Sequence, residues 1–539
     1  MKEMLNGKYR RQTLNKIRHF IGVDFNSLYP SAFSGVYHDA NPYTGGRMYM
    51  PGKVTSFMEN TKEHPWNEAQ KKRAMAIIYN KDRKSKDPAK IDKIELFVAE
   101  VAGYIPPENL NKCINFLPIF RNVDVPLREE VIGKFMSDYM DKNEIARSND
   151  KGYDVRRTLT QLFSTIDYNK DLNLESFNDA KPIPRCAEEY VELAKNNKNY
   201  MGFSSYYLWF LIDEFGFKVT DVKSIITFNK HLRFGNFVNH CMNERQKAIC
   251  REQELKAELK LTTDPVKMED LECGIRAAKV INLYYKNLMN SSYGYDGKRC
   301  DQYNKTAIVD GEKAIREHRN PFHIQTVLLG NNRFLCTKKT KNYKITTPVQ
   351  CAVFTLDNAK FWYLNFIYKF MVKCLDMSKL HFVEGDTDSQ YWGVAGDLND
   401  DYKQGFKHLI VDEKFYNENV HKWLPYDFYT TDGRSPLPEN ASLMEKTMHE
   451  KKLLGCAIEK QGLNIVALGP KCYTTWNDDS TYKCKVKGVS LRTNKHITYE
   501  SYVEVIDKET TINGTNYLLQ YKKIICKDGK DHKKIDANL

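Results

Sequence analysis

Residues 381–394 read HFVEGDTDSQYWGV, in which two short runs rich in apolar residues flank a polar turn. This pattern favours two strands joined tightly to each other. The turn carries Asp386 and Asp388, two carboxylates that are one residue apart. Side chains at i and i+2 share one face of an extended chain, and Mg²⁺ prefers oxygen ligands. Because D-x-D sequences also arise by chance, a solvated or capping turn remains the alternative.

A second carboxylate ends another predicted strand, FIGVDF at 20–25. Asp24 opens the sequence DFNSLYPS, a turn whose backbone N–H groups can hold phosphate oxygens while the carboxylate binds a metal. Capping of a short helix by Asp24, Asn26 and Ser27 is the alternative. The sequence LFVAEV at 96–101 predicts a further strand, and a helix is expected over 348–377.

Residues 233–292 are expected to form two long helices that are broken near Thr262 to Pro265. On the second helix, four polar side chains fall within roughly 60° of one another, which gives the helix a polar face. They are Lys279, Lys286, Asn290 and Tyr293. Apolar residues on the opposite side are expected to form the packed face. They are Ala277, Ala278, Ile281, Tyr284, Tyr285 and Leu288. A solvent-facing stripe is the simpler interpretation of the polar face.

The composition sets limits on the class of protein. The chain has 539 residues, with 82 Lys+Arg against 69 Asp+Glu, a net charge of +13. Its mean hydropathy is −0.60, and no apolar run approaches about 18 residues, so we expect no membrane span and no secretory signal. Thirteen cysteines without a C-x-x-C pair predict free thiols and no zinc site. We therefore expect an intracellular protein of a reducing compartment, nuclear or cytoplasmic.

The charge is unevenly distributed along the chain. Residues 295–348 carry a net charge of +6, whereas residues 386–450 carry −7. Basic segments around a carboxylate centre suit a phosphate-bearing polymer as partner, although solvated surfaces would have the same composition.

Four motifs in order resemble family B DNA polymerases, and specifically their protein-primed branch in bacteriophages, adenoviruses, linear plasmids and Maverick or Polinton transposons. They are DFNSLYPS at 24–31 (motif A), KNLMNSSYG at 286–294 (motif B), GDTDS at 385–389 (motif C) and KCY at 471–473 (the K-x-Y motif). The resemblance implies an α+β right-hand fold, with an antiparallel palm sheet, helical-hairpin fingers, a small thumb and two insertions. It implies template-directed addition of dNMP from dNTP to a primer 3′-hydroxyl.

By this resemblance, Asp24 and Asp388 would bridge two Mg²⁺ ions, with Mn²⁺ as a substitute. The Phe25 carbonyl would be a further ligand, and Asp386 would assist as a catalytic residue. The residues that would bind the nucleotide are Ser27, Leu28, Tyr29, Lys279, Lys286, Asn290 and Tyr293, of which Tyr29 would exclude a 2′-hydroxyl. The residues that would contact primer–template DNA are Ser291, Gly294, Lys471 and Tyr473. The partners implied are primer–template DNA, dNTPs and a terminal (priming) protein, without a membrane.

The expected division is palm 1–51, a first insertion and palm-associated region 52–214, fingers 215–294, a second insertion 295–348, palm 349–490 and thumb 491–539. Only 23 residues precede Asp24, so we expect no 3′–5′ exonuclease domain in this chain. The motif C position that usually holds Tyr is Glu384 or Gly385. Two other functions remain open: an inactive DNA-binding remnant of a mobile element, and a D-x-D nucleotide-sugar glycosyltransferase.

Overall fold

The computed structural model describes most of the chain in several stretches. These are residues 16–35, 40–113, 117–127, 134–142, 156–166, 200–232, 234–298, 304–339, 347–424, 454–477, 482–508, 512–516 and 531–535, with the single positions 129, 144, 146 and 510. The chain divides into two compact units. Unit 1 holds 1–31, 238–352 and 369–539, and unit 2 holds 32–237 and 353–368.

A four-stranded antiparallel sheet in unit 1 confirms the expected strands at 20–25 and 381–394. Its order is β11 (Leu380–Asp386), β12 (Ser389–Val394), β1 (His19–Asn26) and β13 (Gly455–Gly462). Residues 20–23 of β1 are all buried, so both faces of this central strand are covered. Its polar end at Asp24 therefore emerges from a rigid element.

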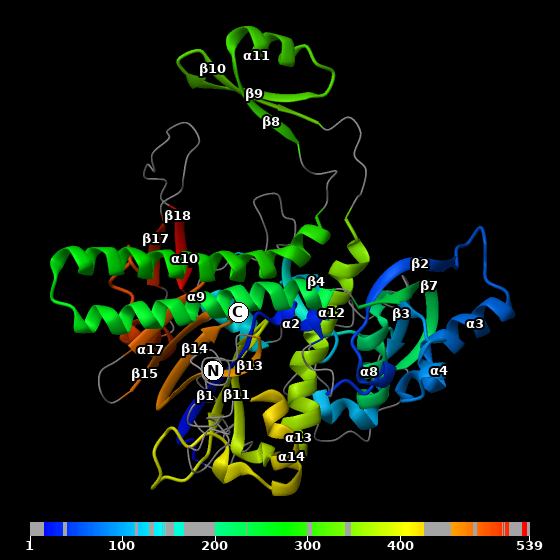
Figure 1. Cartoon of the computed structure of the whole chain (residues 1–539). Coiled ribbons are helices and arrows are strands. Elements are labelled where there is room, and N and C mark those ends of the chain that lie inside the picture. Colours follow the sequence, from blue (N-terminus) through cyan, green and yellow to red (C-terminus); the bar gives the residue numbers. More distant parts are fainter. Residues whose placement is uncertain are drawn as a thin grey trace. The chain divides into compact units, whose positions relative to one another are not determined.

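Two long helices confirm the expected hairpin and lie side by side (Figure 1). They are α9 (Phe234–Leu261) and α10 (Pro265–Asp296), and the Asp264 side chain accepts a hydrogen bond from the Val266 amide at the start of α10. Pro265 at the first helical position suits this cap, because its missing N–H would have no acceptor there. Leu255 of α9 packs with Leu271 and Ile275 of α10.

The sequence after β13 forms a small sheet and a helix with a common core. The sheet contains β14 (Asn464–Gly469), β15 (Cys472–Trp476) and β16 (Tyr482–Val486), and the helix is α17 (Tyr499–Lys508). Leu468, Ile497, Tyr502 and Val505 form the core between them. The KCY strand β15 thus shares a core with α17, and the expected palm–thumb boundary at 490 stays a prediction. Strands β17 (Ile512–Asn516) and β18 (Asp531–Ile535) pair with each other.

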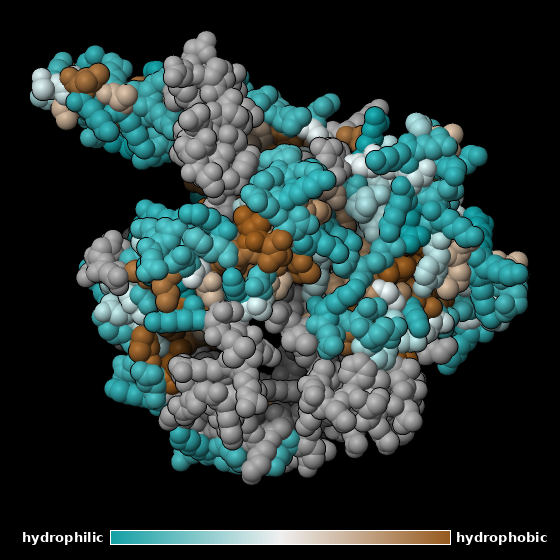
Figure 2. Space-filling model, turned by 90° about the horizontal axis from the view of Figure 1, so that it is seen from below, coloured by the Kyte–Doolittle hydropathy of each residue, from teal (hydrophilic) through white to brown (hydrophobic). Residues whose placement is uncertain are grey.

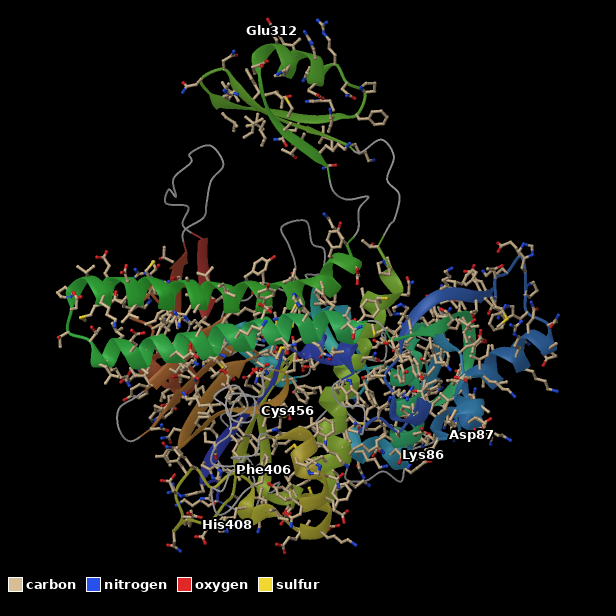
Figure 3. All side chains as sticks on the ribbon, in the orientation of Figure 1. Lys86, Asp87, Glu312, Phe406, His408 and Cys456 are labelled. Carbon is tan, nitrogen blue, oxygen red and sulfur yellow. The ribbon has the colours of Figure 1, made fainter. Side chains whose placement is uncertain are left out.

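Within 295–348, the described residues form a separate small module, which we define as residues 304–339. Its elements are β8 (Lys305–Asp310), α11 (Gly311–His318), β9 (His323–Gly330) and β10 (Arg333–Lys338), with sheet order β8-β10-β9. Helix α11 covers one face of this sheet (Figure 1), and Ala314 and Cys336 are buried there. In Figure 3 the label of Glu312 marks α11.

Unit 2 contains a second four-stranded antiparallel sheet. Its order is β2 (Met50–Glu59), β7 (Lys218–His231), β3 (Leu96–Tyr104) and β6 (Met201–Ser204). Strand β3 confirms the prediction for 96–101. We expected the fingers to begin at 215, but residues 218–231 form the strand β7 between β2 and β3, and the helical hairpin begins only at Phe234. The apolar helix α8 (Ser205–Phe215) is almost wholly buried in this unit.

Shorter elements complete unit 2, including α3 (Glu68–Ile78), α4 (Pro88–Ile91) and the paired strands β4 (Phe120–Pro126) and β5 (Arg156–Leu162). The helix expected over 348–377 is observed as α12 (Val349–Asn365), a π-helical turn (Phe366–Met371) and α13 (Val372–Cys374). Unit 1 also contains α14 (Glu413–Trp423). The described helices include none that is long and apolar enough to span a membrane. On the face seen in Figure 2, most of the coloured surface is hydrophilic.

Candidate active site

The two motif carboxylates are brought together by strand pairing. Asp24 lies opposite Ser389 in the β1–β12 ladder, and the Phe25 amide donates a hydrogen bond to the Asp388 carbonyl over 2.8 Å. In an antiparallel ladder the N–H and C=O of one residue point to the same neighbour, so the Phe25 carbonyl also faces the β12 side. Asp24, Asp388 and the Phe25 carbonyl thus gather at one corner of the sheet.

Burial and like charge act on these carboxylates. Burial raises the pKa of Asp24 to about 7, and the charges of Asp388 and Glu459 add to this. Burial also raises the pKa of Asp388. A bound cation would stabilise the ionised forms of two neighbouring carboxylates whose pKa values are raised. Carboxylate oxygens are hard donors, which suit Mg²⁺. Among the described residues no group of three His, Cys, Asp or Glu side chains could hold a metal.

Asp386 has a different environment from Asp24 and Asp388. Lys471 Nζ lies 3.2 Å from Asp386 Oδ1, and the Thr387 hydroxyl donates to the same oxygen over 2.6 Å. Burial raises the pKa of Asp386, but the hydrogen bonds from Thr387 and Lys471 outweigh it and leave the pKa below its usual value. The structure therefore links the motif C turn to the KCY turn through this ion pair.

Three tight turns around the carboxylates contain residues with left-handed backbone. Ser27, Thr387 and Lys471 have φ angles of 50°, 57° and 57°. Such angles cost a non-glycine residue roughly 1–2 kcal/mol and gather at functional sites. Lys471 follows Pro470 in the two-residue turn between β14 and β15, where glycine would be the unstrained choice. Backbone strain thus accompanies the position from which the lysine reaches Asp386.

A partly buried network lies behind the carboxylates and was missed by sequence reasoning. The Tyr391 hydroxyl donates to Glu459 over 2.6 Å and lies 2.7 Å from the Tyr473 hydroxyl. Lys485 Nζ is 3.3 Å from Glu459 and lies above the Tyr473 ring. No sequence motif signals Glu459, because its place beside Asp24 depends on the pairing of β13 with β1.

Tyr473, expected at the primer strand, has a buried environment. Its side chain is only 3% exposed, and it packs with Phe20 and Tyr391. Its contact with the primer stays a prediction. Glu384, which with Gly385 is one of the two candidates for the motif C tyrosine position, is also buried, and burial raises its pKa to about 7.

The polar face of α10 is present and partly faces the carboxylates. The charge of Lys286 lowers the pKa of Asp24 against the dominant effect of burial. The rings of Tyr293 and Tyr29 lie 3.9 Å apart between centroids, at an interplanar angle of 30°. Lys279 and Lys286 are exposed, and Asn290 is half-buried. Lys286 and Tyr293 of this face therefore lie close to motif A residues.

The opposite face of α10 corrects our packing prediction. Ile281, Tyr284 and Leu288, which we expected to be packed, are 46%, 59% and 37% exposed. Ala278 is buried as expected, but Leu271 and Ile275 form the packed seam with α9, and Met289 is also buried. The hydrophobic pattern was assigned to the wrong stripe because Tyr and Ile occur on more than one side of this helix.

The remaining predicted site residues lie in motif A, at Ser27, Leu28 and Tyr29, and on α10, at Ser291 and Gly294. Ser27 joins β1 to α2 (Leu28–Ser34), whose first-turn amides, including those of Leu28 and Tyr29, lack intrahelical acceptors. The exposed Ser291 donates its hydroxyl hydrogen to the Asn287 carbonyl. Gly294 lies inside α10, and a Cβ atom there would meet nothing within 4 Å. A nucleic acid strand could therefore approach the helix backbone at Gly294.

Comparison with known proteins yields weak similarity only. Neither a family model nor a curated protein matches this chain. Among solved structures, phi29 DNA polymerase complexed with primer-template DNA is 13% identical, with a TM-score of 0.33 over 98% of this chain and 62% of that chain. An orthorhombic crystal form of phi29 DNA polymerase is 12% identical, with a TM-score of 0.34 over 90% of this chain and 53% of the other. This chain thus matches less than two thirds of the length of either, and neither similarity is close enough to support a conclusion.

Proposed function

We propose that this chain is a template-directed DNA polymerase that adds dNMP from dNTP to a primer 3′-hydroxyl. The observation that carries the proposal is the convergence of Asp24 and Asp388 at one corner of the sheet, through the hydrogen bond from Phe25 to Asp388. Motifs A and C, far apart in sequence, supply one carboxylate each to this corner. A D-x-D turn that arose by chance would not be expected to lie next to the carboxylate of a second motif.

Asp24, Asp388 and the Phe25 carbonyl would hold two Mg²⁺ ions. Bound there, the ions would lower the pKa of the primer hydroxyl and neutralise the triphosphate and the departing pyrophosphate. The residues of this chain do the positioning. Asp24 and Asp388 are fixed by the ladder, and Lys471 holds Asp386 in an ion pair.

Helix α10 supplies the nucleotide contacts in this proposal. Lys286, with Lys279 as a second point charge, would bind the triphosphate above the Ser27, Leu28 and Tyr29 amides. The Tyr29 ring, stacked on Tyr293, would occupy the space that a ribose 2′-hydroxyl needs. Asn290 would line the nascent base pair with Tyr293, while Ser291 and Gly294 would face the template–primer.

We further propose that synthesis is protein-primed, with 52–214 receiving the priming protein and 295–348 closing over DNA. The basic residues of the module support this part. Lys338 Nζ is 2.7 Å from Glu317, so it is already neutralised, whereas Arg316, Arg319 and Lys339 remain candidates for phosphate contacts. We expect Arg316→Ala, Arg319→Ala and Lys339→Ala together to weaken the salt dependence of processive, strand-displacing synthesis. Single-nucleotide addition should persist, and unchanged product length would remove the clamp assignment.

A primer-extension assay with and without Mg²⁺ tests the central proposal. We expect labelled dNTP to be incorporated opposite template only when the metal is present. DNA binding without incorporation would favour an inactive remnant, and transfer from a UDP-sugar would favour the glycosyltransferase.

A further inference from the structure

Helix α10 has a third face that neither the seam with α9 nor the proposed nucleotide site uses. We call this face the outer stripe. It consists of Ala277, Val280, Ile281, Tyr284, Leu288 and Tyr295. Of these, the five larger side chains are 37–65% exposed. At 100° per residue, the outer stripe spans about 100° of the helix surface and lies about 170° from the Lys279, Lys286, Asn290 and Tyr293 face.

The width and length of the outer stripe are those of a packing surface. An apolar stripe of about 100° is typical of helix faces that pack on a core. From 277 to 295 it would run about 27 Å along the helix. Scattered apolar residues on a surface need no explanation, but a contiguous patch marks an interaction site.

The module at 304–339 also has an uncovered face. Ile308, Leu335 and Val327 occupy neighbouring positions across β8, β10 and β9, because Leu335 pairs with both of the others. They lie on the face opposite to Cys336, which is buried beneath α11. Ile308 is 61% exposed. A sheet with an apolar row on its open face requires a second layer to bury that row.

Helix α10 and the module hold many of the exposed apolar side chains among the described residues, and six of these lie on the outer stripe or on the sheet row. Of the 24 large hydrophobic residues that are exposed among the described residues, half lie in α10 or in this module. The module follows α10 directly in sequence. The same short part of the chain therefore contains two apolar surfaces that each require a cover.

The connections permit the two surfaces to meet. Eight residues, 297–304, join the end of α10 to β8, and they can span at most about 28 Å. The middle of the outer stripe, near Tyr284, lies about 18 Å from the end of the helix. The return connection leads to α12, and a Cβ atom at Gly297 would lie 3.3 Å from Ala352 Cβ, so the two connections are anchored close together.

We propose that the open sheet face of the module docks on the outer stripe of α10. Ile308, Leu335 and Val327 would then pack across Ile281, Tyr284 and Leu288. Docking on this side leaves the Lys286 face accessible, because the two faces point in nearly opposite directions. Ser291 lies on the docked side one turn beyond Leu288, so the contact must end before it for Ser291 to face the template–primer. The inference goes beyond the proposed function and does not depend on it, since docking would occur in an inactive chain as well.

Photo-crosslinking of the full chain tests the docking. A benzophenone side chain in place of Tyr284 should crosslink to peptides from 304–339 of the same molecule, in a product of monomer mass. The matched control places the probe at the neighbouring Leu283, which is 55% exposed against 59% for Tyr284 but points about 100° away. We expect the Leu283 probe to give little of this product.

A pair of matched substitutions identifies the face of the module. Ile308→Asp should lower the crosslinked fraction by about tenfold, because a charge would have to be buried in the contact. Ile315→Asp should leave the fraction within about twofold, since Ile315 is 59% exposed on α11 and not on the open sheet face. Equal losses in both variants, crosslinks from 284 to another segment or to a second copy, or equal yields from 283 and 284 would each overturn the proposal.

Discussion

The corner of the sheet at Asp24 and the polar face of α10 hold their functional side chains by different means. Asp24 and Asp388 belong to neighbouring strands, and the Phe25–Asp388 hydrogen bond fixes the spacing of their backbones. Lys286 stands exposed on a helix, and its position depends on the helix as a whole. Strand pairing thus fixes the positions of the two carboxylates relative to each other, whereas the charged side chains on α10 shift together when the helix moves.

The largest expected effect is at the sheet corner. Asp24→Asn or Asp388→Asn should lower nucleotide incorporation by about 10³-fold or more, because each removes a charge that metal binding needs. DNA binding, measured by anisotropy, should change little. Asp310→Asn is the matched control, since Asp310 caps α11 and asparagine caps a helix equally well. Retention of a tenth of wild-type turnover in either site variant would exclude the two-metal assignment.

The helix face should give a smaller loss that differs between its two lysines. Lys286→Met should lower kcat/KM for dNTP by about 10²-fold, as expected for loss of one charged contact to the reacting group. Lys279→Met should lower kcat/KM by less than about threefold, because Lys279 lies two helical turns from Lys286 and is exposed to solvent. Single-turnover kinetics with each variant measure this. Equal losses would mean that α10 binds the triphosphate differently from our proposal.

The contact between Tyr29 of motif A and Tyr293 of α10 should decide whether the site selects deoxyribonucleotides over ribonucleotides. Tyr29→Val should relax discrimination against ribonucleotides by about tenfold or more, because the ring that fills the 2′ position is lost. Tyr293→Phe keeps the stacked ring and should preserve discrimination. The measurement is the ratio of kcat/KM for dNTP and NTP. Equal loss for both sugars in Tyr29→Val would instead indicate a packing role.

Metal binding should stabilise the sheet corner in a pH-dependent manner. The pKa of Asp24 is raised from 3.8 to about 7, so the native state keeps a proton that the unfolded state has lost. Without metal, the stability contributed by Asp24 is therefore present at acid pH and lost as pH rises through about 4 to 7. Mg²⁺ should replace that proton, so the rise in Tm on adding it should be larger at about pH 8 than at about pH 6. Calorimetry would contradict this if Asp24→Asn retained the same rise.

The smallest effect concerns the helix backbone. Gly294→Ala should stabilise α10 by up to about 1 kcal/mol, because the position is helical and a methyl group meets no atom. Activity should fall if a nucleic acid strand passes close to the backbone there. At Gly274, in the same helix, an added Cβ would lie 3.0 Å from Leu255 Cδ1, so alanine should stabilise less. A more stable and fully active Gly294→Ala enzyme would remove Gly294 from the DNA contact.

Local patterns in the sequence determined the elements of both regions. The alternation in 381–394 predicted β11, β12 and their turn, and Asp264 with Pro265 marked the start of α10. These features depend on neighbours within a few residues, and such signals are visible in the order of the amino acids. The motifs also placed Asp24 and Asp388 in the candidate site.

Only the tertiary structure decided which distant residues became neighbours. Pairing of β13 with β1 brings Glu459 beside Asp24, and contact between β15 and β12 buries Tyr473 against Tyr391. The same holds for α10, where packing against α9 selected the stripe of Leu271 and Ile275 and left Tyr284 exposed. Strand register and helix packing depend on shape and burial summed over segments far apart in the chain, so no local pattern could assign these contacts.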